Sequence, residues 1–139
     1  MIILDTNVLS ALMLRQPSLE VAAWIDQQPR TSVWTTTITI FEIRYGLALL
    51  ASGRRRSERE LMFKRALEEK LEGRILLFDE LAAEEAAILS AARQRSGRSV
   101  ELRDTMIAGI ALAQRATLAT RNVRHFDDLT VPVVDPWHA

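Results

Sequence analysis

Short apolar runs alternate with longer amphipathic stretches along the whole chain. The runs are bounded by polar turns and several are β-branched, which is typical of buried strands. We predict strands at residues 2–4, 32–36, 75–78, 117–120 and 131–134. The stretches between them carry apolar side chains at helical spacing, which predicts helices over residues 8–14, from Pro17 until Pro29, and over 37–51, 54–72, 81–94 and 102–115.

This alternation of strands and helices defines the expected fold. Strands that are joined by helices rather than by tight hairpins form mostly parallel sheets, with helices on both faces. We therefore predict the α/β class, with a central, mostly parallel sheet of about five strands flanked by helices. The chain has 139 residues and shows no repeat or linker, so we expect a single domain over residues 1–139. Sheets of this kind bind ligands beyond the carboxyl ends of their strands.

Two aspartates stand at positions where such a sheet presents its ligand site. Asp5 directly follows the first strand, and Asp104 stands at the start of the helix over residues 102–115. Each of them, taken alone, is explained equally well as a helix cap or as an anion at a helix N-terminus.

Glu42 is the more informative acid. In the helix over residues 37–51, the residues Ile38, Phe41, Tyr45 and Leu49 fall at helical spacing, and we expect them to form its apolar face. Glu42 has Ile38, Tyr45 and Leu49 at i−4, i+3 and i+7, so we expect its carboxylate to lie on this apolar face. A buried carboxylate is costly unless something compensates it. A buried arginine is one explanation, and a functional site is the one that we favour.

Together the three acids indicate a metal site. An α/β sheet can bring Asp5, Glu42 and Asp104 to one crevice, where they would repel one another unless a cation joined them. Oxygen donors without cysteine or a histidine cluster select Mg²⁺ or Mn²⁺ over zinc. Such a metal lowers the pKa of a bound water and stabilises charge on a phosphate, which suits phosphodiester hydrolysis.

The composition narrows the class of protein. There is no cysteine, which excludes disulfides and thiol chemistry and favours a cytoplasmic location. No apolar run is long enough to span a membrane, and the N-terminus has no signal-peptide pattern. The 18 basic and 18 acidic side chains balance, which argues against nucleic-acid binding by bulk charge alone. No GxSxG motif or phosphate-binding glycine loop is present, and we expect His125 to be a loop residue rather than a ligand.

Four motifs resemble those of PIN domains, in order and at fitting intervals. They are residues 2–8 (IILDTNV), 37–46 (TITIFEIRYG), 103–108 (RDTMIA) and 119–126 (ATRNVRHF). The closing residues 134–137 (VDPW) are similar to the tail of the FitB-like branch of VapC toxins.

The resemblance implies an α/β PIN fold and a Mg²⁺-dependent or Mn²⁺-dependent endoribonuclease. It implies a toxin that a cognate antitoxin holds inactive. The antitoxin carries a DNA-binding domain through which the complex binds operator DNA, and the toxin dimerises. Asp5, Glu42 and Asp104 occupy the positions of the family's acidic residues.

The chain departs from the family pattern at one position. Many PIN domains have a fourth acid where this chain has Asn122, which is expected to bind metal only through a neutral oxygen. Asp127 is near enough in sequence to substitute partly, although Asp127 and Asp128 also suit a solvated turn. Thr6, Asn7 and Arg121 are the residues that we expect to position the substrate. Their simpler roles are helix capping and surface charge.

Two further predictions concern the rest of the chain. The basic residues between 54 and 65 are interleaved with glutamates, so we interpret this segment as a solvated helix with i,i+4 ion pairs rather than as an RNA-binding patch. We expect the three tryptophans to pack in the core or in an interface.

Two other functions remain open from the sequence. A phosphatase of the haloacid dehalogenase type would also use an aspartate at a strand end, here Asp5, and Asp127-Asp128 could mimic its late metal motif. It needs a second acid two residues later, where this chain has Asn7. The other alternative is a PIN-like module that binds a partner or RNA without catalysis, and the three intact acids argue against it.

Overall fold

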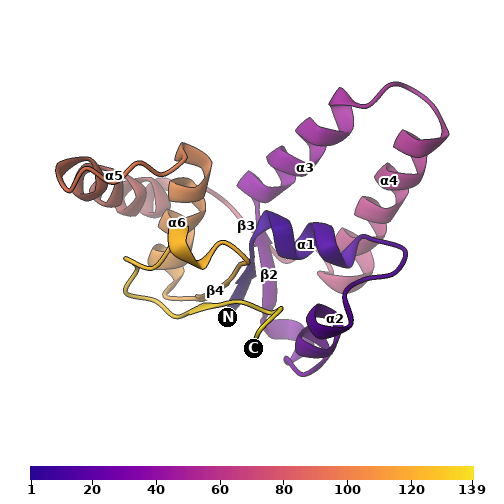
Figure 1. Ribbon diagram of the computed structural model, residues 1–139, viewed down its shortest axis with the longest axis horizontal. Coiled ribbons are helices and arrows are strands. Elements are labelled where there is room, and N and C mark those ends of the chain that lie inside the picture. Colours follow the sequence, from indigo (N-terminus) through magenta and orange to yellow (C-terminus); the bar gives the residue numbers. More distant parts are fainter.

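The computed structural model describes residues 1–139 and contains one five-stranded sheet (Figure 1). The strand order is β3-β2-β1-β4-β5, and every neighbouring pair is parallel. The strands are β1 (Ile2–Leu4), β2 (Val33–Thr36), β3 (Ile75–Leu76), β4 (Thr117–Ala119) and β5 (Val133–Val134). The predicted fold class is confirmed, and all five strands form within the predicted segments.

Six α-helices surround this sheet. They are α1 (Thr6–Leu12), α2 (Leu19–Asp26), α3 (Thr37–Leu49), α4 (Arg54–Arg65), α5 (Glu80–Arg95) and α6 (Leu102–Gln114). Three short turns complete the chain, namely η1 (Arg30–Ser32), the π-helical η2 (Ala66–Lys70) and η3 (Val123–His125). Two expectations are corrected. Pro17 lies outside the first turn of α2, which begins only after Ser18, and the helix expected over 54–72 changes to π-helical hydrogen bonding at Ala66.

The helices form two layers, and each layer has its own hydrophobic core. In Figure 1, α5 and α6 lie on one side of the sheet and α1 to α4 on the other. Alternation along each strand supplies both cores, because successive side chains point to opposite faces. Ile3 and Leu118 pack with α5 and α6, whereas Leu4 and Ala119 pack with α1 to α4. The tryptophans pack against these cores, as predicted, and no helix is both long and apolar enough to cross a membrane.

The buried face of α3 differs from the predicted one. Thr39, Ile43 and Leu47 are buried, whereas Phe41 and Tyr45 are about half exposed, at 56% and 52%. Leu49 is also exposed. Figure 1 shows the reason: only the start of α3 lies over the sheet, and the helix then projects away from it together with α4.

Helices α5 and α6 approach each other closely at Gly109. A Cβ atom added there would lie 2.6 Å from the carbonyl oxygen of Ala82 and 2.7 Å from the Cβ of Ala86. Small residues on both helices therefore permit this contact in the middle of α6.

Candidate active site

Asp5 lies where β1 ends and α1 begins, and its carboxylate is buried. Its backbone N–H donates to the carbonyl of Ala119 at 2.9 Å, which keeps the ends of β1 and β4 together. The carboxylate caps α1 by accepting the N–H of Thr6 at 2.8 Å. It also accepts the hydroxyl of Thr120 at 2.7 Å and the amide of Asn7 at 3.3 Å. Asp5 is thus a helix cap whose carboxylate is also held by two further side chains.

Glu42 reaches the same place from α3. Its Oε1 accepts the hydroxyl of Thr6 at 3.0 Å, and that hydroxyl also lies 3.1 Å from the Thr39 hydroxyl. Glu42 is half-buried and forms no ion pair, so the alternative of a buried arginine partner is wrong. The expectation that Glu42 lies on a buried apolar face is also wrong, because Tyr45 and Leu49 are exposed. Thr6 therefore connects two carboxylates, by its N–H to Asp5 and by its hydroxyl to Glu42.

Asp104 approaches from the first turn of α6. Its side chain is only 13% exposed, and its Oδ2 lies 2.8 Å from Nδ1 of His125. His125 belongs to η3, which follows β4, so the segment after β4 folds back onto α6. His125, which we expected to be a loop residue rather than a ligand, lies against one of the predicted acidic residues.

The three carboxylates influence one another electrostatically. Burial is the main cause that raises the pKa of Asp5, and the charge of Asp104 raises it further. Burial also raises the pKa of Glu42, and the charges of Asp5 and Asp104 add to the effect. Hydrogen bonds from Thr6 to both groups oppose these shifts. Negative charge is therefore concentrated where β1, α3 and α6 meet.

We expect ionisation of the Glu42 carboxyl to destabilise the metal-free protein as the pH rises. A carboxyl group whose pKa is higher in the folded than in the unfolded chain stabilises the fold fully below its unfolded value, here 4.5, and this contribution is lost as pH rises through the folded value. Glu42→Gln should therefore gain stability relative to wild type as the pH rises above 4.5. Thermal unfolding in EDTA measures this difference, and a difference that stays constant across the pH range would contradict the expectation.

The three residues expected to position the substrate lie around this cluster. Thr6 and Asn7 bond directly to the carboxylates, as described above. The Asn7 Oδ1 also accepts the backbone N–H of Arg121 at 3.1 Å. The guanidinium of Arg121 stacks on Trp137, 4.7 Å from the ring centroid, and Arg121 is exposed. Asn122 takes part through its backbone: its N–H donates to the Thr120 hydroxyl at 3.0 Å, and its carbonyl accepts the N–H of His125 at 3.0 Å.

Asp127 does not substitute for the missing fourth acid. It pairs with Arg98 at 2.7 Å, and Asp128 pairs with the buried Arg93 at 2.9 Å. Both acids therefore pair with arginines and form no bond with the three candidate carboxylates, so the late metal motif of a phosphatase has no counterpart here.

Sequence reasoning assigned no role to Thr120 and Thr39. Thr120 follows β4, which neighbours β1, so a hydroxyl at this strand end was a usable signal. Thr39 had no comparable signal. By contrast, the predicted i,i+4 pairs on α4 are confirmed by Arg54–Glu58 and Arg56–Glu60.

The donor chemistry of the cluster fits a hydrated divalent cation. The side chains as placed contain no group of three acidic residues or histidines that would hold a metal ion directly. Mg²⁺ usually keeps several waters and binds through only one or two carboxylates, so it does not require three converging ligands. Burial and the charge of Asp104 raise the pKa of Asp5 and of Glu42, so a cation would be favourable beside them, and carboxylate oxygens favour such an ion over zinc.

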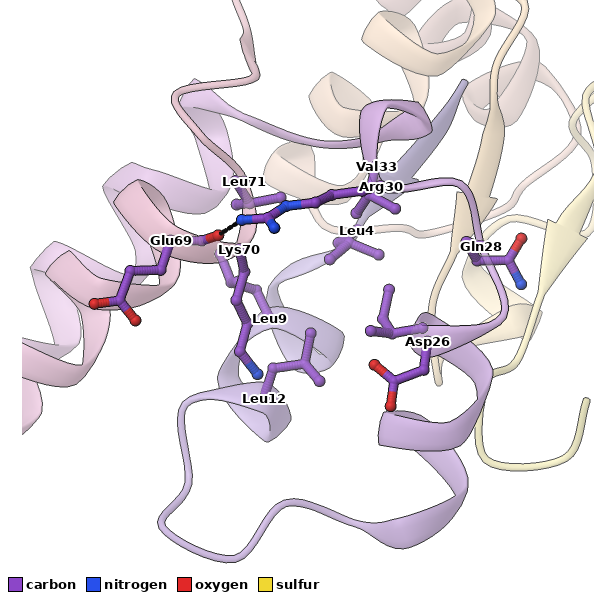
Figure 2. A pocket seen from close by; sticks show the side chains of 11 residues that line it. Leu4, Leu9, Leu12, Asp26, Gln28, Arg30, Val33, Glu69, Lys70 and Leu71 are labelled. Carbon is purple, nitrogen blue, oxygen red and sulfur yellow. Dashed lines mark hydrogen bonds between the residues drawn. The ribbon is translucent and has the colours of Figure 1, made fainter.

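A separate cavity lies between α1, α2 and η2 (Figure 2). Its volume is about 350 Å³, and its floor is formed by apolar side chains that include Leu4, Leu9 and Leu71. Two polar side chains at its rim are paired with backbone carbonyls: Arg30 donates to Glu69, drawn as a dashed line in Figure 2, and Gln28 donates to Trp24. None of the three candidate carboxylates lines this cavity, so it is not part of the candidate site.

A family model, several related sequences and a solved structure each match nearly the whole chain. The family model for the PIN domain matches residues 2–131. The plasmid stability protein StbB of Pseudomonas syringae pv. tomato is 37% identical over 139 residues and covers 100% of both chains. The VapC ribonuclease Y4jK of Sinorhizobium fredii is 37% identical over 141 residues, which cover 99% of this chain and 98% of that protein. The toxin FitB of Neisseria gonorrhoeae is 35% identical and covers 99% of both chains. A structure of FitAB bound to an IR36 DNA fragment superposes with a TM-score of 0.88 at 34% identity, over 100% of this chain and 97% of that one.

Proposed function

Because the chain belongs to the PIN-domain family, and within it to the VapC and FitB toxins of toxin–antitoxin systems, we propose that it is a Mg²⁺-dependent or Mn²⁺-dependent endoribonuclease neutralised by a cognate antitoxin. VapC toxins of this family are nucleases, which makes the chain a hydrolase of phosphodiesters. We propose that residues 1–139 form a single PIN domain.

One observation supports this function above the others: Asp5 at the end of β1 and Glu42 on α3 both accept a hydrogen bond from Thr6, and the charge of Asp104 on α6 acts on both carboxylates. Asp5, Glu42 and Asp104 would hold the cation directly or through its waters, and Asn122 would offer a further neutral oxygen. The bound ion would supply an activated water and would stabilise the charge that develops on the phosphate. PIN-domain nucleases generally use a divalent metal.

The remaining residues of the cluster have supporting roles in this proposal. Thr6, Asn7 and Thr120 hold the carboxylates in place by donating hydrogen bonds to them. The exposed guanidinium of Arg121 stacks on Trp137, and the backbone N–H of Arg121 donates to Asn7. Arginine binds phosphate oxygens bidentately, so Arg121 suits contact with the RNA backbone.

Neither alternative function is favoured. A phosphatase would need an acid in place of Asn7, and here the Asn7 amide donates to Asp5 instead. A binding module without catalysis gives no account of why three carboxylates that repel one another should be kept together.

The function is tested by incubating the purified, partner-free protein with a mixture of structured RNAs in Mg²⁺, in Mn²⁺ and in EDTA. We expect discrete products that disappear in EDTA, with ends that identify the substrate. Accumulation of a phosphorylated Asp5 would instead indicate the phosphatase. A folded protein that binds no Mg²⁺ and cleaves no RNA would indicate the binding module.

The antitoxin partner is proposed to bind beside the carboxylates. A groove of about 350 Å³ between α1, α3 and α4 is lined by Thr6, Glu42 and apolar side chains, among them Leu14, Leu47 and Met62. A segment bound there would contact Glu42 and keep RNA from the site. The antitoxin would also bring the complex to operator DNA, as the DNA-bound FitAB complex suggests. We also propose that the toxin forms a homodimer.

Leu14→Asp is expected to weaken antitoxin binding by about tenfold or more, because a charge would replace an exposed apolar side chain at the groove. RNA cleavage by the free toxin should be unchanged. Titration of the antitoxin against cleavage measures the effect, and Leu81→Asp, on the equally exposed start of α5, is the control. Equal inhibition of both variants would place the partner elsewhere.

A further inference from the structure

Arg93 is a buried cation outside the carboxylate cluster. It lies near the end of α5, and only 4% of its side chain is exposed. A buried guanidinium is unfavourable unless its N–H groups are bonded and its charge is paired. Here both conditions are met, and the partners come from two other segments of the chain.

The bonds of Arg93 join α5 to α6, to η3 and to the turn that follows η3. Its Nε and Nη2 each donate to one oxygen of Asp128 at 2.9 Å, which is the bidentate arrangement of a guanidinium and a carboxylate. Its Nη1 donates to the Thr105 hydroxyl at 2.8 Å, and Nη2 also donates to the carbonyl of His125 at 2.7 Å. These bonds lower the pKa of Asp128, mainly through its hydrogen bond to Arg93.

Each end of this network lies next to the candidate active site. Thr105 directly follows Asp104 in the first turn of α6. The His125 carbonyl that Arg93 holds belongs to the residue whose ring lies 2.8 Å from the Asp104 carboxylate. Arg93 therefore bonds the backbone carbonyl of His125 and the side chain of Thr105, the residue that follows Asp104. Since His125 itself is exposed, burial of its ring does not hold it in place.

Packing alone does not explain this arrangement. Buried ion pairs contribute little net stability compared with apolar residues of similar volume, although they do select one geometry. Arginine also differs from lysine here, because only a planar guanidinium can bond Asp128 with two parallel N–H groups while it reaches Thr105 and His125.

We propose that Arg93 is a positioning residue for the active site, which acts by holding His125 against Asp104. The inference rests on the proposed function for its catalytic consequence but not for its structural one. Arg93 touches neither the carboxylate cluster nor a substrate, so its effect on cleavage passes through His125 and Asp104.

The first test monitors the surroundings of the His125 ring by NMR. The chain has two histidines, and His138 pairs with Asp135 near the C-terminus, so it serves as an internal control. In Arg93→Lys, the NMR signals of the His125 ring at constant pH should shift or broaden, whereas those of His138 should not change. Arg74→Lys removes a guanidinium that bonds the backbone of Val33 and Arg30, and it should leave both rings unaffected. Unchanged His125 signals in Arg93→Lys would overturn the proposal.

The second test asks whether the effect of Arg93 on RNA cleavage depends on His125. Loss of groups that orient metal ligands lowers activity by roughly 10–100-fold, so Arg93→Lys should lower kcat by this factor with little change in KM. In a His125→Ala background the same substitution should change kcat by less than about twofold, because its intermediary is already lost. If kcat of the double variant falls by the product of the two single losses, the proposal is overturned, because a general structural defect would act independently of His125.

Two further arms keep the test decisive. If Arg93→Lys does not fold, Asp128→Asn replaces it, because it leaves Arg93 in place and weakens the charged pair at a partly exposed site. If the wild-type protein cleaves no RNA, the proposed function fails, and the His125 ring signals alone decide whether Arg93 positions this residue.

Discussion

Asp104→Asn is expected to lower RNA cleavage by at least about a hundredfold while the fold is retained. Loss of a group that only orients a metal ligand costs roughly 10–100-fold, and Asp104 is proposed to be a ligand itself. The fold should persist because an asparagine oxygen can still accept a hydrogen bond from His125 Nδ1, and because removal of the charge reduces repulsion of Asp5 and Glu42.

The matched control is Asp79→Asn. Asp79 is also an aspartate at a helix start, where its carboxylate accepts the N–H of Ala82 at 3.0 Å, and asparagine caps helices equally well. This variant should cleave RNA like wild type. Initial rates under saturating Mg²⁺ compare the two variants. An Asp104→Asn protein that cleaves as fast as Asp79→Asn would remove Asp104 from the site.

Gly109→Ala is expected to destabilise the protein by roughly 1–3 kcal/mol, which is typical of an overpacked core. Alanine is ordinarily the better helix residue by about 1 kcal/mol, so the sign of the effect depends on packing alone. At this position the added methyl group would lie 2.6 Å from a backbone oxygen of α5, which cannot rotate away. Helix α5 must therefore move, and it carries Arg93.

Gly46→Ala provides the comparison for this prediction. Gly46 lies in α3, and a Cβ added there would meet no atom within 4 Å. The same chemical change should then raise stability by about 0.5–1 kcal/mol. Urea denaturation of both variants gives the two free energies of unfolding. Two effects of the same sign would contradict the close contact between α5 and α6.

The fold could be predicted because its signals are local. The apolar runs of the five strands, the cap residues Asp5 and Asp79, and the glycine and proline breaks each depend on a few neighbouring residues. The spacing of apolar residues predicted where the helices lie, but it did not always predict which of their side chains are buried. On α3 the spacing of Phe41, Tyr45 and Leu49 predicted a buried face, yet burial depends on whether the sheet extends beneath the helix, and here it does not.

The candidate site could be predicted only in part, because its contacts join distant segments. The three acids stood out by their positions in the motifs; in the structure Thr6 joins Asp5 to Glu42, whereas Asp104 bonds His125. The bond from Thr6 to Glu42 spans 36 positions in the sequence, and that from Arg93 to Asp128 spans 35. No local pattern marks such pairs. Asp127 and Asp128 do lie in an exposed turn, as the sequence suggested, but their pairing with Arg98 and Arg93 could not be predicted from it.

Direct measurement of divalent-cation binding tests the central claim, that Asp5, Glu42 and Asp104 form one metal site. Partner-free protein that has been stripped with EDTA would be titrated with Mn²⁺ and followed by electron paramagnetic resonance, with thermal unfolding in Mg²⁺ in parallel. We predict saturable binding that is lost in Asp5→Asn and in Asp104→Asn but is retained in Asp79→Asn. Mg²⁺ at a hundred times its dissociation constant should stabilise the wild type by about 2.7 kcal/mol. Binding of equal strength in all four proteins, or no binding by the folded wild type, would contradict the account.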